Sequence, residues 1–126
     1  MYLIGNQESA GVELYITAER KLEFGVWRKD GSGYERVTGK TTVDTDTIYH
    51  VTAIYDGKTS YLYVNNKLEG TLETDGGMVN NPPENIHMLI GANPTTDSNG
   101  KIDIHYLARL AKMKLYRAEV YALQKK

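Results

Sequence analysis

Apolar and polar residues alternate in short runs along this chain, a period that is typical of β-strands. In KLEFGVW, residues 21–27, Leu22, Phe24 and Val26 share one face. Trp27, the only tryptophan, falls on the opposite face. The pattern therefore predicts a strand with one core face and a second face that carries an aromatic side chain.

The alternation is clearest in IYHVTAIYDGKTSYLYVNNKLEG, residues 48–70. In its central part, Leu62 and Val64 lie on one face of a strand, and Tyr61 and Tyr63 lie on the other. The Asn pair that follows suits a two-residue turn, because Asn tolerates a positive φ. The stretch is therefore predicted to form successive antiparallel strands joined by tight turns.

Turn-forming residues separate the other apolar runs. Further strands are expected at residues 2–5, 12–17, 34–40, 67–73 (KLEGTLE) and 86–92, and polar connections at 28–33, 74–85 and 93–101. The Thr-rich segment 41–47 is expected to be a loop or a sheet edge. Short strands at this spacing, separated by turn signals, are typical of a β-sandwich.

Residues 107–118 are ambiguous. Good helix formers, with apolar residues three or four positions apart, favour a helix. A period of two over 109–117 instead places Ala111, Met113 and Leu115 on one face of a strand. The local sequence is compatible with both.

Length, charge and composition narrow the classes of protein. The 126 residues suit one domain, which can bury about two thirds of its unfolded surface. The net charge of -1 argues against nucleic acid as a partner, because phosphate binding needs a positive excess. The chain has no cysteine and no long apolar run, so disulfides, thiolate metal sites and a membrane span are not expected.

The first residues lack the charged and apolar segments of a signal peptide. YLIGN has the pattern of a strand from its first residue, so we expect the natural chain to continue upstream.

Three segments, in their order and spacing, resemble the laminin-G-like, concanavalin A-like sandwich domains. YHVTAIYDG and LYVNN match the family's aromatic-His-Val, Tyr-Asp-Gly and Leu-Tyr-Val pattern. MLIGANP, residues 88–94, is similar to the strand of this family that carries the pattern Ile-Gly-Ala/Gly-Asn. YLARLAKMKLY, residues 106–116, lies where the family has its last strand, although Ala108, Ala111 and Lys112 replace the usual Gly, Asp and Glu.

The resemblance implies an all-β fold, an antiparallel two-sheet jelly-roll sandwich of the concanavalin A-like type. It implies a domain over residues 1–118 with a C-terminal tail at 119–126, and a strand rather than a helix at 109–117. The family's opening strands have no counterpart here, so an open sheet edge could pair with a second copy and form a dimer. The family also implies an extracellular or cell-surface location.

Glycosidases share this sandwich, but they need two carboxylates that flank the scissile bond. Asp44 and Asp46 stand in a Thr-rich stretch without a neighbouring Glu, and Asp103 stands alone. The three histidines are not spaced as metal ligands, and the sequence has no nucleophile elbow or phosphate-binding loop. The domain is therefore predicted not to be an enzyme.

Many domains that this chain resembles bind calcium through loop oxygens. The segment NPTTDSNGKID supplies hard oxygen donors, namely Asn93, Asp97, Asn99 and Asp103. An ordinary polar loop would have the same composition. Calcium is the one cofactor that the chain suggests.

In sandwiches of this kind a sugar would stack on an aromatic ring while polar neighbours bind its hydroxyl groups. Trp27 and the adjacent Arg28 are the leading candidates, followed by Tyr34, Tyr61 and Tyr63. Alternatively, these side chains only cover the outer face of a sheet.

These observations favour a non-catalytic recognition module of a larger secreted or surface protein, with a glycan as its ligand. The alternative is a protein-binding or adhesion module that uses the segments 74–85 and 93–101, and a third possibility is a purely structural accessory domain. Glycan binding that disappears in Trp27→Ala would favour the first.

Overall fold

The computed structural model describes the chain except at residues 7–10, 76–87, 92, 97–101, 106–117 and 123–126. The strands are β1 (Tyr2–Gly5), β2 (Val12–Ile16), β3 (Lys21–Trp27), β4 (Tyr34–Thr42), β5 (Val51–Tyr55), β6 (Thr59–Val64), β7 (Lys67–Glu73), β8 (Leu89–Ile90), β9 (Asn93–Thr96), β10 (Ile102–His105) and β11 (Ala118–Ala122). The described ranges contain no helix, and the all-β prediction is confirmed. None of these ranges therefore offers a helix that could cross a lipid bilayer.

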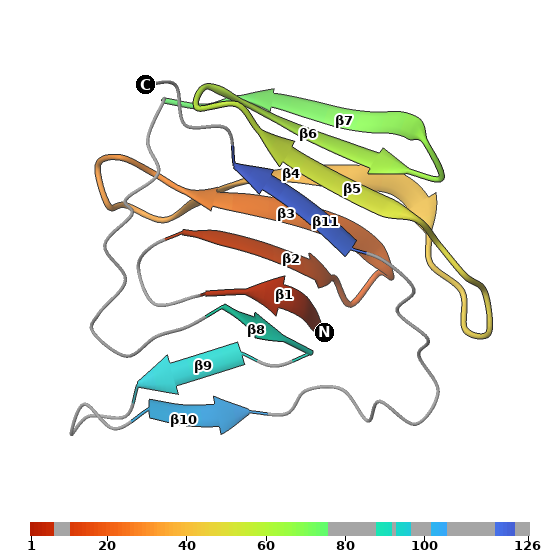
Figure 1. Cartoon of the computed structure of the whole chain (residues 1–126), viewed down its shortest axis with the longest axis horizontal. Coiled ribbons are helices and arrows are strands. Elements are labelled where there is room, and N and C mark those ends of the chain that lie inside the picture. The colour runs from red at the N-terminus through yellow and green to blue at the C-terminus, as the bar shows by residue number, and fades with distance from the viewer. Residues whose placement is uncertain (7–10, 76–87, 92, 97–101, 106–117, 123–126) are drawn as a thin grey trace.

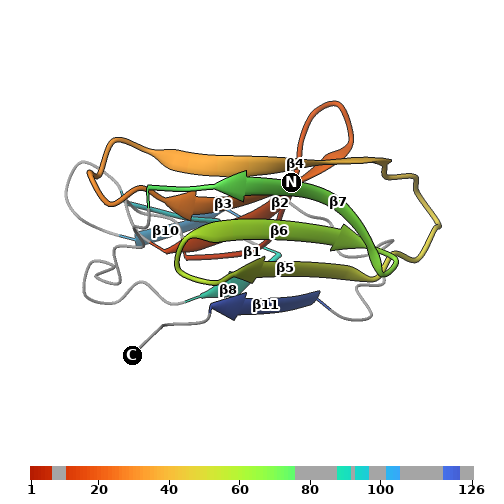
Figure 2. The same cartoon turned by 90° about the horizontal axis from the view of Figure 1, so that it is seen from above.

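The strands form two main sheets and a separate hairpin. One sheet has the order β4-β3-β2-β1-β8, the other has the order β11-β5-β6-β7, and β9 pairs with β10 (Figure 1). Seen from above, the four-stranded sheet lies over the five-stranded sheet as a second layer (Figure 2). This is the predicted two-sheet sandwich, and its sheets are antiparallel except where β11 runs parallel to β5.

The core lies between the two layers. Leu14, Leu22 and Phe24 point into it from the five-stranded sheet, and Ala53 and Leu62 meet them from the other sheet. Burying one such large apolar side chain stabilises the fold by about 1.5–3 kcal/mol at most. The alternation predicted for β3 and β6 is confirmed, because their apolar positions are the buried ones.

The predicted turn between β6 and β7 is also confirmed. Asn65 and Asn66 have φ values of 50° and 64°, the left-handed region that Asn tolerates. The Asn65 side chain accepts a hydrogen bond from the backbone N–H of His50 at 2.9 Å. The turn is thereby tied to the residue that precedes β5.

Glu69 connects the two layers at one edge of the sandwich, where β4 passes beside β7 (Figure 2). The register between β6 and β7 skips Glu69, which is buried. The register between β3 and β4 likewise gives no partner to Gly39–Thr41. The backbone N–H groups of Lys40 and Thr41 donate instead to Glu69 Oε2, at 2.7 and 2.9 Å, and the Thr41 hydroxyl donates to Oε1. The irregular strand β7 thus supplies, across the layers, the hydrogen-bond acceptor for groups of the irregular strand β4.

The polar connection predicted at 93–101 is wrong for its first residues. Asn93–Thr96 form β9, whose Thr95 and Asn93 face Asp103 and His105 of β10. The segment lacks apolar alternation, but pairing with β10 satisfies its backbone groups, and Thr favours extended backbone. In the segment 41–47, expected to be a loop or a sheet edge, Thr41 and Thr42 belong to β4, which is the edge strand of its sheet.

Three further predictions differ from the structure or cannot be compared with it. Within the strand expected at 86–92, the described strand is only Leu89–Ile90. The expected strand at 109–117 lies outside the described residues. Strand β11 crosses the expected boundary at 118, so residues 119–122 belong to a sheet and not to a tail, because their backbone pairs with β5.

Candidate functional site

The outward face of the five-stranded sheet carries one aromatic side chain from each of four neighbouring strands. Tyr2 of β1 packs on Tyr15 of β2 with ring centroids 5.4 Å apart. Trp27 of β3 meets Tyr34 of β4 edge to face, at 4.8 Å and 75°. Each pair is a cross-strand pair in the sheet register, and all four residues are half-buried. Alternation places Tyr2, Tyr15 and Trp27 there, because Leu3, Leu14 and Val26 beside them are buried in the core, and the register sets Tyr34 opposite Trp27.

Arg36 of β4 connects the two aromatic pairs. Its guanidinium carbon lies 5.1 Å from the ring centroid of Tyr34 and 5.9 Å from that of Tyr15. Both separations suit a cation–π contact. We call Tyr2, Tyr15, Trp27, Tyr34 and Arg36 the aromatic face.

A buried carboxylate lies beneath Arg36. Arg36 Nε donates to Glu13 Oε1 at 2.6 Å, and the Glu13 side chain is 0% exposed. Burial raises the pKa of Glu13, although the Arg36 charge acts in the opposite direction. Burial is the largest single influence on Arg36 and would lower its pKa, but the charge and hydrogen bond of Glu13, together with Tyr15 and Glu23, outweigh burial and raise that pKa. The pair holds the guanidinium in place between the rings.

A second carboxylate, Glu23 of β3, lies on the same face. It accepts hydrogen bonds from the Tyr15 hydroxyl and, at 2.8 Å, from Thr38 Oγ1. Burial raises the pKa of Tyr15 well above its usual value, and the bond to Glu23 adds to the effect. Tyr15 therefore stays a hydroxyl donor, and the face combines flat apolar rings with fixed polar groups. Such a surface can bind a polyhydroxylated ligand.

The family of the chain follows from a comparison with family models. The model described as the concanavalin A-like lectin/glucanases superfamily, of the laminin G type, matches residues 1–117. The chain belongs to this superfamily. No curated protein and no solved structure gives a match. Domains of the superfamily often bind carbohydrates or proteins, and its laminin G-like and lectin members are generally not catalytic.

The predicted ligand residues occupy three different places in this concanavalin A-like domain. Trp27 and Tyr34 are together on the aromatic face. Tyr61 and Tyr63 lie on the outward face of the other sheet, since Leu62 between them is buried in the core. There Tyr63 lines a shallow hollow with Thr52, Ile54 and Asn66.

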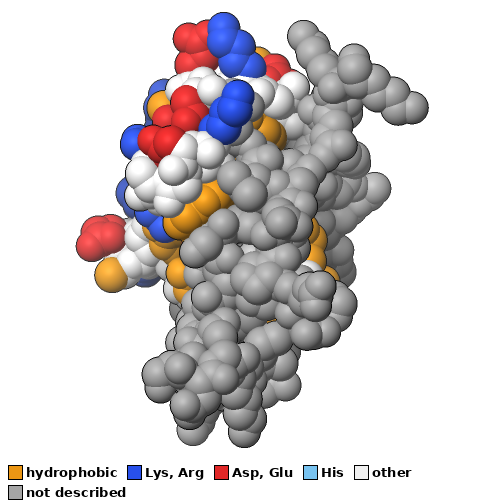
Figure 3. All heavy atoms as spheres, turned by 90° about the vertical axis from the view of Figure 1, so that its left-hand side faces the viewer, with side chains coloured by type: hydrophobic (Ala, Val, Ile, Leu, Met, Phe, Trp, Pro, Cys, Tyr) orange, Lys and Arg blue, Asp and Glu red, His pale blue; other side chains and the backbone are white. Residues whose placement is uncertain are grey.

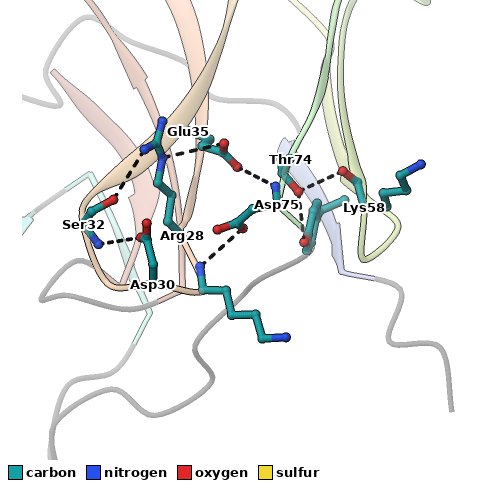
Figure 4. Close-up of polar contacts among 9 residues, drawn as sticks. Arg28, Asp30, Ser32, Glu35, Lys58, Thr74 and Asp75 are labelled. Atoms are coloured by element: carbon teal, nitrogen blue, oxygen red, sulfur yellow. Dashed lines mark hydrogen bonds and ion pairs between the residues drawn. The ribbon is translucent and has the colours of Figure 1, made fainter.

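Arg28 is directed away from the aromatic face, into the turn between β3 and β4. Its Nε lies 3.6 Å from Glu35 Oε1, and its Nη1 lies 3.4 Å from Ser32 Oγ (Figure 4). In the same network Asp75 accepts from the backbone N–H of Lys29 and donates its own N–H to Glu35. Arg28 is thus part of the contacts that join this turn to the end of β7.

The end of the sandwich where this network lies is mixed in charge. Acidic and basic side chains stand next to each other over its described part (Figure 3). Lys58 Nζ and Glu73 Oε1, for example, are 2.6 Å apart. Exposed pairs of this kind contribute little to stability. The described part of this end offers neither a basic nor an acidic patch for a charged ligand.

Two of the four calcium candidates lie in the paired strands β9 and β10. Asn93 is in β9 and Asp103 is in β10, while Asp97 and Asn99 lie outside the described residues. Within the ranges that the structure describes, no three His, Cys, Asp or Glu residues gather as metal ligands would. The calcium site stays a prediction.

Sequence reasoning did not identify Tyr2, Tyr15, Arg36, Glu13 or Glu23 as site residues. The signal was present in part, since VELYI and YERV alternate like β3 and set Glu13, Tyr15, Tyr34 and Arg36 opposite the core positions. What alternation alone could not supply is the register that joins these strands, because register depends on contacts between distant segments.

Proposed function

We propose that this domain is a non-catalytic carbohydrate-recognition module of a larger secreted or surface protein, and that a glycan binds on its aromatic face. One observation carries the proposal: four strands place four aromatic rings and a held guanidinium on one outward surface. Rings offer apolar area to the C–H face of a sugar, and fixed polar groups bind its hydroxyls. The superfamily, whose members often bind carbohydrates, supports this choice.

The carboxylates of this face support a binding role rather than hydrolysis. A glycosidase needs two carboxyl groups that reach opposite sides of the scissile bond. Glu13 is fully buried under Arg36, and Glu23 is engaged by Tyr15 and Thr38. Both carboxylates are used to fix neighbouring side chains.

The test is a binding screen on a glycan array, followed by titration of the best ligand. We expect Trp27→Ala to weaken binding at least about tenfold, because it removes the largest ring of the face. Tyr63→Ala is the matched control, since it removes an aromatic side chain from the other outward face. A melting curve of each variant shows whether the fold is retained.

Two results would contradict the proposal. Binding that survives Trp27→Ala but disappears in Tyr63→Ala would show that the ligand binds to the four-stranded sheet and not to the aromatic face. No glycan binding at millimolar protein would exclude the carbohydrate role, and the alternative of a protein-binding or structural accessory module would take its place.

A further inference from the structure

We propose that the aromatic face selects uncharged glycans and discriminates against acidic ones, whether their charge comes from sialic acid, a uronate or a sulfate. The inference rests on the proposed function and narrows its ligand. It follows from the balance and placement of charge among the residues that surround the rings.

Among the described residues, the cation that lies over the rings of the aromatic face is Arg36, and it is already paired. Arg36 binds Glu13 at 2.6 Å, and its side chain is 39% exposed. The other guanidinium N–H groups have no acceptor among the described residues. They can donate to hydroxyl oxygens, but the positive charge behind them is compensated by the carboxylate below.

The second carboxylate leaves an excess of negative charge. The described partners of Glu23 are the hydroxyl groups of Tyr15 and Thr38, which are neutral. Glu23 lies between Tyr15 of β2 and Thr38 of β4 in the register of the sheet and is hydrogen-bonded to the Tyr15 hydroxyl, so it is next to the rings. With Glu13 and Arg36 compensating each other, Glu23 carries the uncompensated charge among the described residues next to the rings.

Lys21 lies two positions before Glu23 in β3, on the same side of the sheet but outside the aromatic face. Its ammonium group is directed to β4, where Nζ donates to the Lys40 carbonyl at 2.5 Å and to Thr42 Oγ1 at 2.7 Å. No ion pair joins Lys21 to Glu23 in the part of the chain that is described. Lys21 therefore does not neutralise Glu23.

The experiment uses an array with neutral, sialylated, uronate-containing and sulfated glycans at low salt, where charge effects extend furthest. The hits are then titrated in matched neutral and acidic forms. We expect neutral hits, with acidic analogues about fivefold weaker, which corresponds to about 1 kcal/mol for one unpaired charge nearby. Glu23→Gln removes the charge, keeps one oxygen acceptor and offers an amide N–H that the other hydroxyl can accept, so it should remove most of that difference.

Glu73→Gln is the control, because it makes the same change in net charge on the other sheet and should leave the ratio unchanged. Acidic hits, or a neutral-to-acidic ratio that Glu23→Gln does not move, would overturn the charge selection while leaving glycan binding intact. No hit of any kind would overturn the proposed function itself.

Discussion

At the scale of single residues, Gly25 makes room for the buried carboxylate of the aromatic face. It lies opposite Glu13 in the pairing of β2 with β3, and a Cβ built on it would lie 2.7 Å from Glu13 Oε1 and 2.8 Å from Glu13 Cγ. The Glu13 side chain therefore lies across the backbone of β3, under Arg36. A glycine in the middle of a strand weakens the strand, but here it permits this arrangement.

Gly25→Ala is expected to destabilise the domain by about 1–3 kcal/mol, because the new methyl group displaces the Glu13 side chain. Urea denaturation of the wild type and the variant measures the loss. In a protein that already carries Glu13→Ala, the new methyl group has no carboxylate beside it. Gly25→Ala should then cause little further loss in the free energy of unfolding. Equal costs in both backgrounds would show that Glu13 does not set the requirement for glycine.

At the scale of elements, the contact between β4 and β7 depends on one side chain. KLEGTLE is predicted as a strand from its sequence and is found at those bounds, but its alternation does not reveal that Glu69 is skipped in the register. The bulge turns the carboxylate toward β4. Burial alone would raise the pKa of Glu69, but the hydrogen bonds from Thr41 and Lys40 outweigh burial and lower it.

Glu69→Ala is expected to lower the free energy of unfolding by about 3 kcal/mol, since it leaves two backbone N–H groups and a hydroxyl without their acceptor. Chemical denaturation checks the value. Thr71→Ala, at an exposed position of the same strand, is the control and should change stability by less than about 0.5 kcal/mol. A comparable loss in both variants would contradict a special role for Glu69.

The same carboxylate predicts a pH dependence. Because the folded-state pKa of Glu69 lies below its unfolded value, its contribution is complete above the unfolded value, near 4.5, and is lost as the pH falls through the folded value. Glu13, with a raised pKa, acts in the opposite sense and at higher pH: it lowers stability as the pH rises from the unfolded value toward its raised folded value. Melting curves from pH 3 to pH 7 should therefore show a shallower acid loss in Glu69→Gln than in the wild type. An unchanged slope would show that the carboxylate is not the titrating group.

At the scale of the whole molecule, β11 completes the four-stranded sheet from the far end of the chain. Its five residues pair in parallel with the whole of β5. The superfamily match stops at residue 117, just before this strand. Without β11, β5 would be an edge strand with unpaired backbone groups.

A chain that ends after residue 117 is expected to melt about 5 °C lower or more, and to aggregate more readily, because β5 loses its neighbour. A chain that ends after Ala122 keeps β11 and is the matched control. Differential scanning calorimetry and light scattering compare the two. Equal melting temperatures would show that β11 does not contribute to the fold.

The sequence by itself determines the local part of this protein. The bounds of β3 and β7, the buried faces of β3 and β6 and the Asn65–Asn66 turn follow from period-two alternation and from the backbone preference of Asn. The order and spacing of these segments also suffice to indicate the superfamily. All of these depend on residues close together in the chain.

Only the tertiary structure decides how the segments combine. Register joins residues as far apart as Tyr2 and Tyr34 into one aromatic face and separates Trp27 from its sequence neighbour Arg28. Bulges place Glu69 against β4, and pairing turns the polar residues Asn93–Thr96 into a strand. The physical reason is common to these cases: hydrogen bonding and burial between distant strands outweigh local preference, and no local pattern encodes their partners.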